Sequence, residues 1–172
     1  AQILEVIPEA EGRVKEKLVE AIGERKIDDS TGLLVDLAKN DDNRRVQVAA
    51  TKSLARVASP DDLDTLIDIL VNAGGTAERR EAERTVITVA MKMQDAGERS
   101  AKIKAALETA TAPDAKASLL QVAGNIGDPQ MLPVLKNYLQ GDNAELRKAA
   151  IRALSEWPNA EPKEQLLTVA KT

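Results

Sequence analysis

The stretch DNAELRKAAIRAL at residues 142–154 decides the fold, because a related stretch, DNRRVQVAATKSL, occurs one hundred residues earlier at 42–54. The two stretches align without a gap, and each places apolar residues at the 3.6-residue spacing of an amphipathic helix. Residues 85–93 and 118–126 occupy the same slots. A further copy comprises Val14, Lys15, Leu18, Val19 and Ile22, with Lys15 as its weak member. Helices that recur in register indicate an internal repeat.

A second type of helix alternates with the first. Leu63, Leu66 and Leu70 follow Pro60 at the same spacing at which Leu132, Leu135 and Leu139 follow Pro129. Two antiparallel helices every 31 to 36 residues are typical of an α-solenoid, in which each hairpin buries its apolar side only against its neighbours. We therefore predict an all-α, right-handed α-solenoid of about five helical hairpins, forming a single repeat domain over residues 1–172.

Helix-start residues set the expected boundaries. Ser59-Pro60 and Asp128-Pro129 each combine a capping side chain with Pro at the first helical position. Asp142 with Glu145 suggests a capping box, and Thr76 is a further N-cap candidate. The helices are expected at residues 10–26, 30–39, 43–58, 60–73, 76–94, 98–111, 114–126, 129–140, 144–157 and 161–171.

The stretches 42–54 and 142–154, together with the turn Gly127-Asp128-Pro129, resemble the bacterial HEAT-repeat pattern. That pattern consists of an acidic turn, Val/Leu-Arg, a pair of Ala and a Leu. The resemblance covers the chain from about residue 10 and implies a superhelix. In such a superhelix the second helix of each hairpin, here the type expected at residues 43–58 and 144–157, lines the concave face. The Arg of the pattern is present at Arg147 but is replaced by Gln47 and Lys116 in other copies, so we expect an incomplete Asp–Arg ladder between repeats.

Composition excludes several kinds of chemistry. The chain has no His and no Cys, which removes Ser-His-Asp and Cys-His catalysis, structural zinc and disulfides. It has no Phe and one residue each of Trp and Tyr, so the core is expected to consist of small aliphatic side chains. A net charge of -4 argues against a dedicated nucleic-acid binder. No apolar run is long enough to cross a bilayer.

The acidic clusters, the glycines and the single Trp are each explained by a structural role. The acidic clusters at residues 28–29, 41–42 and 61–68 are interpreted as helix-start residues rather than metal ligands, because negative charge is favoured there. Gly74-Gly75 and Gly97 are interpreted as turns, since no phosphate-loop Lys-Ser/Thr follows them. Trp157 occupies a core slot, which favours a buried side chain over an exposed partner anchor.

One charge pattern suggests a binding surface. Once the core slots of the second helices are assigned, the opposite face carries mostly basic residues. We call this set the basic lane, and its members are Arg13, Lys17, Arg45, Lys52, Arg84, Gln121, Lys148 and Arg152. Either these residues are ordinary solvated charges that pair with nearby Glu, or they attract an acidic protein segment or another polyanion.

The sequence therefore predicts a non-catalytic protein-interaction scaffold or docking module without cofactors or metals, whose partner is a protein or an attached domain of a longer chain. The alternative is a nucleic-acid-binding protein that uses the basic lane. Residues 154–162 are similar to repeat regions of large bacterial multidomain proteins that are often exported, so a periplasmic location is favoured over a cytoplasmic one. The apolar start at residues 1–7 and the uncapped last helix lead us to expect a repeat module of a longer protein.

Overall fold

The structure, a computed structural model, describes the backbone of residues 2–170 and the side chains of residues 3–167. Within that range every regular element is a helix, and no strand occurs. The chain divides into two compact units, Ala1–Val89 and Ala90–Thr172, which are described separately. The all-α prediction is confirmed.

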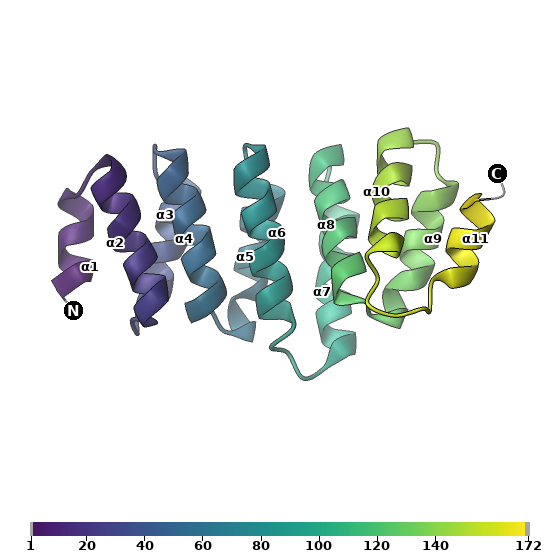
Figure 1. Ribbon diagram of the computed structural model, residues 1–172, viewed down its shortest axis with the longest axis horizontal. Coiled ribbons are helices and arrows are strands. Elements are labelled where there is room, and N and C mark those ends of the chain that lie inside the picture. The colour runs from purple at the N-terminus through teal and green to yellow at the C-terminus, as the bar shows by residue number, and fades with distance from the viewer. Residues whose placement is uncertain (1, 171–172) are drawn as a thin grey trace. The chain divides into compact units, whose positions relative to one another are not determined.

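In both units, helices follow one another as antiparallel hairpins in chain order (Figure 1). Unit 1 contains α1 (Gln2–Val6), η1 (Ile7–Glu9), α2 (Gly12–Arg25), α3 (Thr31–Asn40), α4 (Arg44–Val57), η2 (Pro60–Asp62), α5 (Leu63–Val71) and α6 (Thr76–Ala90). Unit 2 contains α7 (Ala96–Thr109), α8 (Pro113–Ile126), η3 (Pro129–Met131), α9 (Leu132–Gln140), α10 (Ala144–Ser155) and α11 (Lys163–Ala170).

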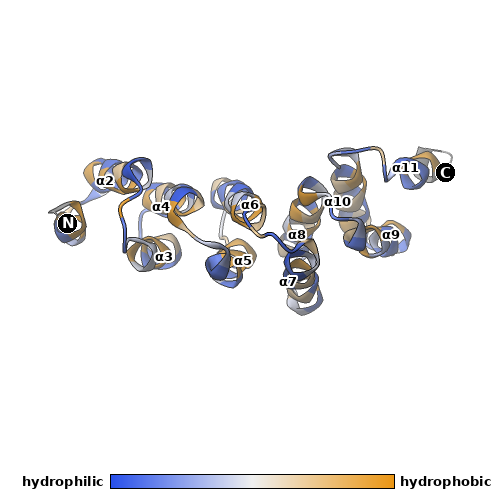
Figure 2. Ribbon diagram, turned by 90° about the horizontal axis from the view of Figure 1, so that it is seen from below, coloured by the Kyte–Doolittle hydropathy of each residue, from blue (hydrophilic) through white to orange (hydrophobic). Residues whose placement is uncertain are grey.

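Within each unit, one second helix contacts both its hairpin partner and the second helix of the preceding hairpin. In unit 1, α4 packs against α3 and α2, and in unit 2, α10 packs against α9 and α8. Individual helices carry both hydrophobic and hydrophilic residues (Figure 2), as expected when one face is buried. Contacts between successive hairpins are the packing expected of an α-solenoid.

Small aliphatic side chains fill the cores, as predicted. The fully or almost fully buried residues include Val19, Ile22, Leu34, Leu54, Leu66 and Leu70 in unit 1 and Leu119, Leu120, Val122 and Leu135 in unit 2. Trp157 is buried at 6% exposure, so the core interpretation of this residue is confirmed. Burial of apolar surface in these cores stabilises each unit by roughly 25 cal/mol for every Å² removed from water.

Four details of the sequence interpretation are wrong. Residues 2–6 form helix α1, which is too short to show helical periodicity. Val14 is 64% exposed although it was placed in a core slot, because it lies on a side of α2 that neither α1 nor α4 covers. The side chain of Asn143, not of Asp142, caps α10, accepting from the N–H groups of Glu145 and Leu146. Thr76 is the first residue of α6 rather than its N-cap.

In four helices a side chain of the first turn makes the same hydrogen bond to the preceding backbone. The fourth residue of α4, α6, α7 and α10 is Gln or Arg, and its side chain donates a hydrogen bond to the carbonyl oxygen six residues earlier. The bonds join Gln47 to Asp41 (2.7 Å), Arg79 to Ala73 (2.7 Å), Arg99 to Met93 (3.4 Å) and Arg147 to Gly141 (2.7 Å). These bonds satisfy carbonyl groups near the end of the preceding segment. Gln47 and Arg147 thus hold the turn of their own hairpin.

The fourth residue of α2 makes a different contact. The Lys15 ammonium lies 2.6 Å from a carboxylate oxygen of Asp41, in the turn of the next hairpin, and both side chains are largely buried. The other oxygen of Asp41 accepts the N–H of Asn43, the N-cap residue of α4. Lys15 therefore links successive hairpins through an ion pair, whereas Gln47, Arg79, Arg99 and Arg147 bind backbone carbonyl oxygens.

A candidate partner-binding groove in unit 1

The second helices α2 and α4 approach each other through very small side chains. A Cβ atom added to Gly23 would lie 2.6 Å from the Ser53 hydroxyl oxygen and 2.8 Å from the Ser53 Cα. The Ser53 hydroxyl donates a 2.9 Å hydrogen bond to the Val19 carbonyl oxygen, one turn before Gly23. A Gly–Ser contact of this kind permits close packing of two helix backbones.

The corresponding contact between α4 and α6 is bulkier. The Thr85 hydroxyl donates a 2.9 Å hydrogen bond to the Thr51 carbonyl oxygen, which repeats the Ser53–Val19 bond 32 residues later. The same register places Ala55 where α2 has Gly23. Thr and Ala each carry one methyl group more than Ser and Gly, so this contact requires a wider spacing between the helices than the α2–α4 contact.

Two hollows lie beside this wider contact. One, of about 390 Å³, is lined by α3, α4, α5 and the turn before α6, and we call it the polar hollow. The other, of about 520 Å³, is lined by α2, α4 and the first turns of α6, and we call it the α4 groove. Arg44 and Glu78 line both hollows, and an Arg44 Nε–Glu78 Oε1 ion pair of 3.5 Å stands between them.

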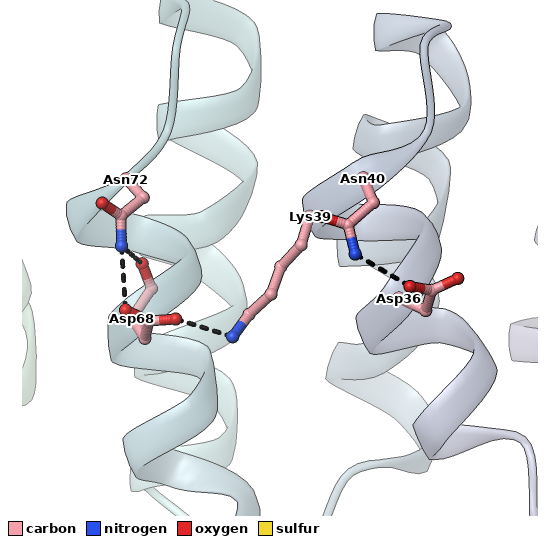
Figure 3. A network of polar contacts seen from close by, with 5 residues as sticks. All are labelled: Asp36, Lys39, Asn40, Asp68 and Asn72. Carbon is pink, nitrogen blue, oxygen red and sulfur yellow. Dashed lines mark hydrogen bonds and ion pairs between the residues drawn. The ribbon is translucent and has the colours of Figure 1, made fainter.

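The polar hollow is bordered by a network of charged and amide side chains (Figure 3). Lys39 on α3 donates to a carboxylate oxygen of Asp68 on α5 at 2.6 Å, and Asn72 donates to the other oxygen of Asp68 at 2.8 Å. Asn40 donates to Asp36 on the same face of α3. These side chains satisfy one another, so the polar hollow offers few free hydrogen-bonding groups to a ligand.

The α4 groove has an apolar floor and a charged rim. Val48 and Ala49 of α4 and Ala77 of α6 contribute apolar surface. The rim carries Arg45 and Lys52 on α4, Glu16 and Glu20 on α2, and Glu78 and Glu81 on α6. A concave surface with apolar contacts and a few convergent polar groups is the usual form of a binding site.

The basic lane residues of unit 1 fall into two groups. Lys17 pairs with Glu20 at 2.5 Å and Arg84 with Glu81 at 3.7 Å, each within one helix. The hydrogen bond from Lys17 to Glu20, with the Coulombic attraction of that carboxylate, raises the pKa of Lys17 above its ordinary value. Arg13, Arg45 and Lys52 are exposed, and their side chains make no ion pair within the described part of the chain. Arg45 and Lys52 of this second group also line the α4 groove.

The basic lane residues of unit 2 are more fully engaged. Gln121 on α8 donates to the Glu156 carboxylate, which also accepts a 3.0 Å bond from Asn125. Lys148 pairs with Glu145 at 2.9 Å on α10. Arg152 is exposed on the same helix. The free positive charge is therefore lower in this unit than the sequence pattern alone indicates.

Carboxylates of two of the three acidic clusters, at residues 41–42 and 61–68, cap turns or bridge elements, and Asp128 outside the clusters caps η3. Asp62 accepts bonds from the backbone N–H and the hydroxyl of Ser59 at the start of η2, and Asp128 accepts the N–H of Gln130 at the start of η3. Within the residues whose placement is described, no three potential metal ligands come together. The helices there also include none long and apolar enough to span a membrane.

Sequence reasoning found Arg45 and Lys52 of the α4 groove but missed most of its other residues, among them Arg44, Val48 and Glu78. Val48 follows Gln47 and is not one of the positions at which apolar residues recur between the repeats. Arg44 and Glu78 stand 34 residues apart, close to one repeat length, each in the first turn of a second helix. The repeat pattern gave no signal for this pair, because Arg44 is the first residue of α4 and Glu78 the third residue of α6.

Comparison with known proteins gives a match that covers most of the chain. A family model described as HEAT repeats matches residues 1–87 and 100–172. The unmatched residues 88–99 span the end of α6, the following turn and the start of α7, where the two units meet in the sequence. A search of curated proteins finds no match to the chain.

Proposed function

Because the chain belongs to the HEAT-repeat family, whose members generally serve as protein-interaction scaffolds and are typically non-catalytic, we propose that it is a docking module. Its partners bind the exposed surface of the second helices, which are α2, α4 and α6 in unit 1 and α8 and α10 in unit 2. Many modest contacts along such a surface hold a partner without a deep pocket.

The observation that carries this proposal is the α4 groove. It combines accessible apolar surface at Val48 with two exposed cations, Arg45 and Lys52, that have no ion pair within the described residues. Surface cations that lack an internal partner are free to pair with a bound protein, and a desolvated pair of that kind contributes more than an exposed one.

The test is a charge reversal on this surface. We expect the double variant Arg45→Glu/Lys52→Glu to lose the proteins that the wild-type chain captures from a lysate of its source cells, identified by mass spectrometry. The matched control is Lys104→Glu/Lys136→Glu, which makes the same net charge change at exposed positions on the first helices α7 and α9. Equal capture by both double variants contradicts binding through α4.

A further inference from the structure

We propose that the α4 groove selects an acidic segment of a partner protein, which inserts one apolar side chain between two carboxylates. This inference rests on the proposed docking function and names the partner chemistry. Its apolar contact is with Val48, and its two carboxylates pair with Arg45 and Lys52.

The spacing of Arg45, Val48 and Lys52 along α4 defines the spacing of the complementary side chains on the partner. Arg45 and Lys52 are seven residues apart, which is about 10.5 Å along a helix and close to two full turns, so they project from the same side. Val48 lies between them at the i+3 position and is only partly buried. A partner helix with carboxylates at i and i+7 and an apolar residue at i+3 or i+4 repeats this spacing.

The charges around the groove favour an acidic occupant once existing pairs are taken into account. On the α2 side, Glu20 is engaged by Lys17 at 2.5 Å. On the α6 side, Glu81 is paired with Arg84 at 3.7 Å and Glu78 with Arg44 at 3.5 Å. Of the rim charges without an ion pair in the described residues, two are positive, Arg45 and Lys52, and one is negative, Glu16.

The size of the groove supports an inserted side chain. Its volume of about 520 Å³ lies in the range of ligand pockets, and its lining comes from α2, α4 and the first turns of α6. An apolar side chain placed over Val48 and Ala49 removes apolar surface of both molecules from water. Flanking carboxylates then give the orientation and the selectivity against basic segments.

The experiment uses fluorescence anisotropy of labelled helical peptides with the full chain. The first probe, about 18 residues long for helicity, carries Glu at i and i+7 and Leu at i+3 and i+4 in an Ala/Gln background. In the second probe both Leu are Ser, and in the third both Glu are Lys. We expect the first probe to bind at least about tenfold more tightly than either of the others.

Protein variants locate the site. Arg45→Ala/Lys52→Ala and Val48→Ser are each expected to weaken the first probe about tenfold, whereas Lys104→Ala/Lys136→Ala leaves its affinity unchanged. Circular dichroism verifies that each variant remains helical. No binding of the first probe, equal binding of the first and third probes, or full affinity in the Arg45→Ala/Lys52→Ala variant overturns the inference.

Two further measurements identify other occupants. Duplex DNA that binds more tightly than the first probe, with affinity falling steeply as salt rises, indicates a phosphate-binding surface and overturns the inference. Self-association in sedimentation that the Arg45→Ala/Lys52→Ala variant abolishes indicates a second copy, and also overturns it. If the peptides fail while Arg45→Glu/Lys52→Glu still abolishes partner capture, the proposed docking function stands and only the acidic-segment inference is wrong.

Discussion

Replacing Gly124 by Ala tests whether close approach of second helices holds unit 2 together. Gly124 is a buried residue of α8 that faces α10. A Cβ atom at this position would lie 2.3 Å from the Ala153 carbonyl oxygen, 2.6 Å from its Cα and 2.7 Å from its carbonyl carbon. These are backbone atoms, so the clash is relieved only if the two helices move apart.

Two opposing effects set the size of the change. Ala is favoured over Gly in a helix interior by about 1 kcal/mol. Overpacking costs about 1 to 3 kcal/mol, and the upper end applies here because backbone cannot rotate away as a side chain does. We therefore expect a net destabilisation of about 2 kcal/mol, which lowers the melting temperature by about 8 to 16 °C for a cooperative unit of the size of unit 2, Ala90–Thr172.

The assay is thermal and urea unfolding followed by circular dichroism. Gly32→Ala is the matched control, because Gly32 is an exposed residue of α3 with no atom within 4 Å of an added Cβ. The control is expected to gain about 0.5 kcal/mol from helix propensity alone. Stability of Gly124→Ala equal to or above wild type would refute the close-packing argument.

Three further changes test local interactions. Lys26→Gly is expected to stabilise the chain by about 1 kcal/mol in urea unfolding, because Lys26 ends α2 in the left-handed region at φ 47°. Asp41→Ala is expected to cost about 2 to 3 kcal/mol, since it leaves the largely buried Lys15 unpaired, whereas Asp68→Asn, at an exposed pair, costs about 1 kcal/mol or less in the same assay. Burial raises the pKa of Tyr138, the single tyrosine, above its ordinary value of 10.0, so absorbance titration should show ionisation at higher pH in the folded than in the unfolded chain. Folding favours the neutral phenol, so its contribution to stability is present below pH 10 and falls as pH rises above it; an identical midpoint in denaturant contradicts this assignment.

The helices were predictable because helical period, capping residues and Pro positions agree along most of the chain. Ser59-Pro60 and Asp128-Pro129 begin η2 and η3 as expected. The errors arise where local sequence does not decide the outcome. Asp142 and Asn143 are adjacent and both can cap, so the choice between them depends on the path of the preceding turn. Val14 fits the apolar slot, but its burial depends on whether a neighbouring helix covers it.

The candidate site was predictable only in part, for a related reason. The sequence pattern places Arg45, Lys52 and Arg84 on one type of surface, and all three are exposed. It does not show that Glu81 already engages Arg84 while Arg45 and Lys52 have no such partner in the described residues. Pairing depends on side-chain reach between successive turns and helices, which spacing along the chain does not specify.

The width of a helix contact connects these points to function. Gly23 with Ser53 brings α2 close to α4, whereas the equivalent Ala55 and Thr85 add two methyl groups between α4 and α6. Such a difference is small in sequence and does not disturb the repeat pattern, and Thr51, which accepts the Thr85 hydrogen bond, also lines the polar hollow. The spacing of successive helices in a solenoid can therefore change through one small residue pair, without any residue that has a chemical signature of its own.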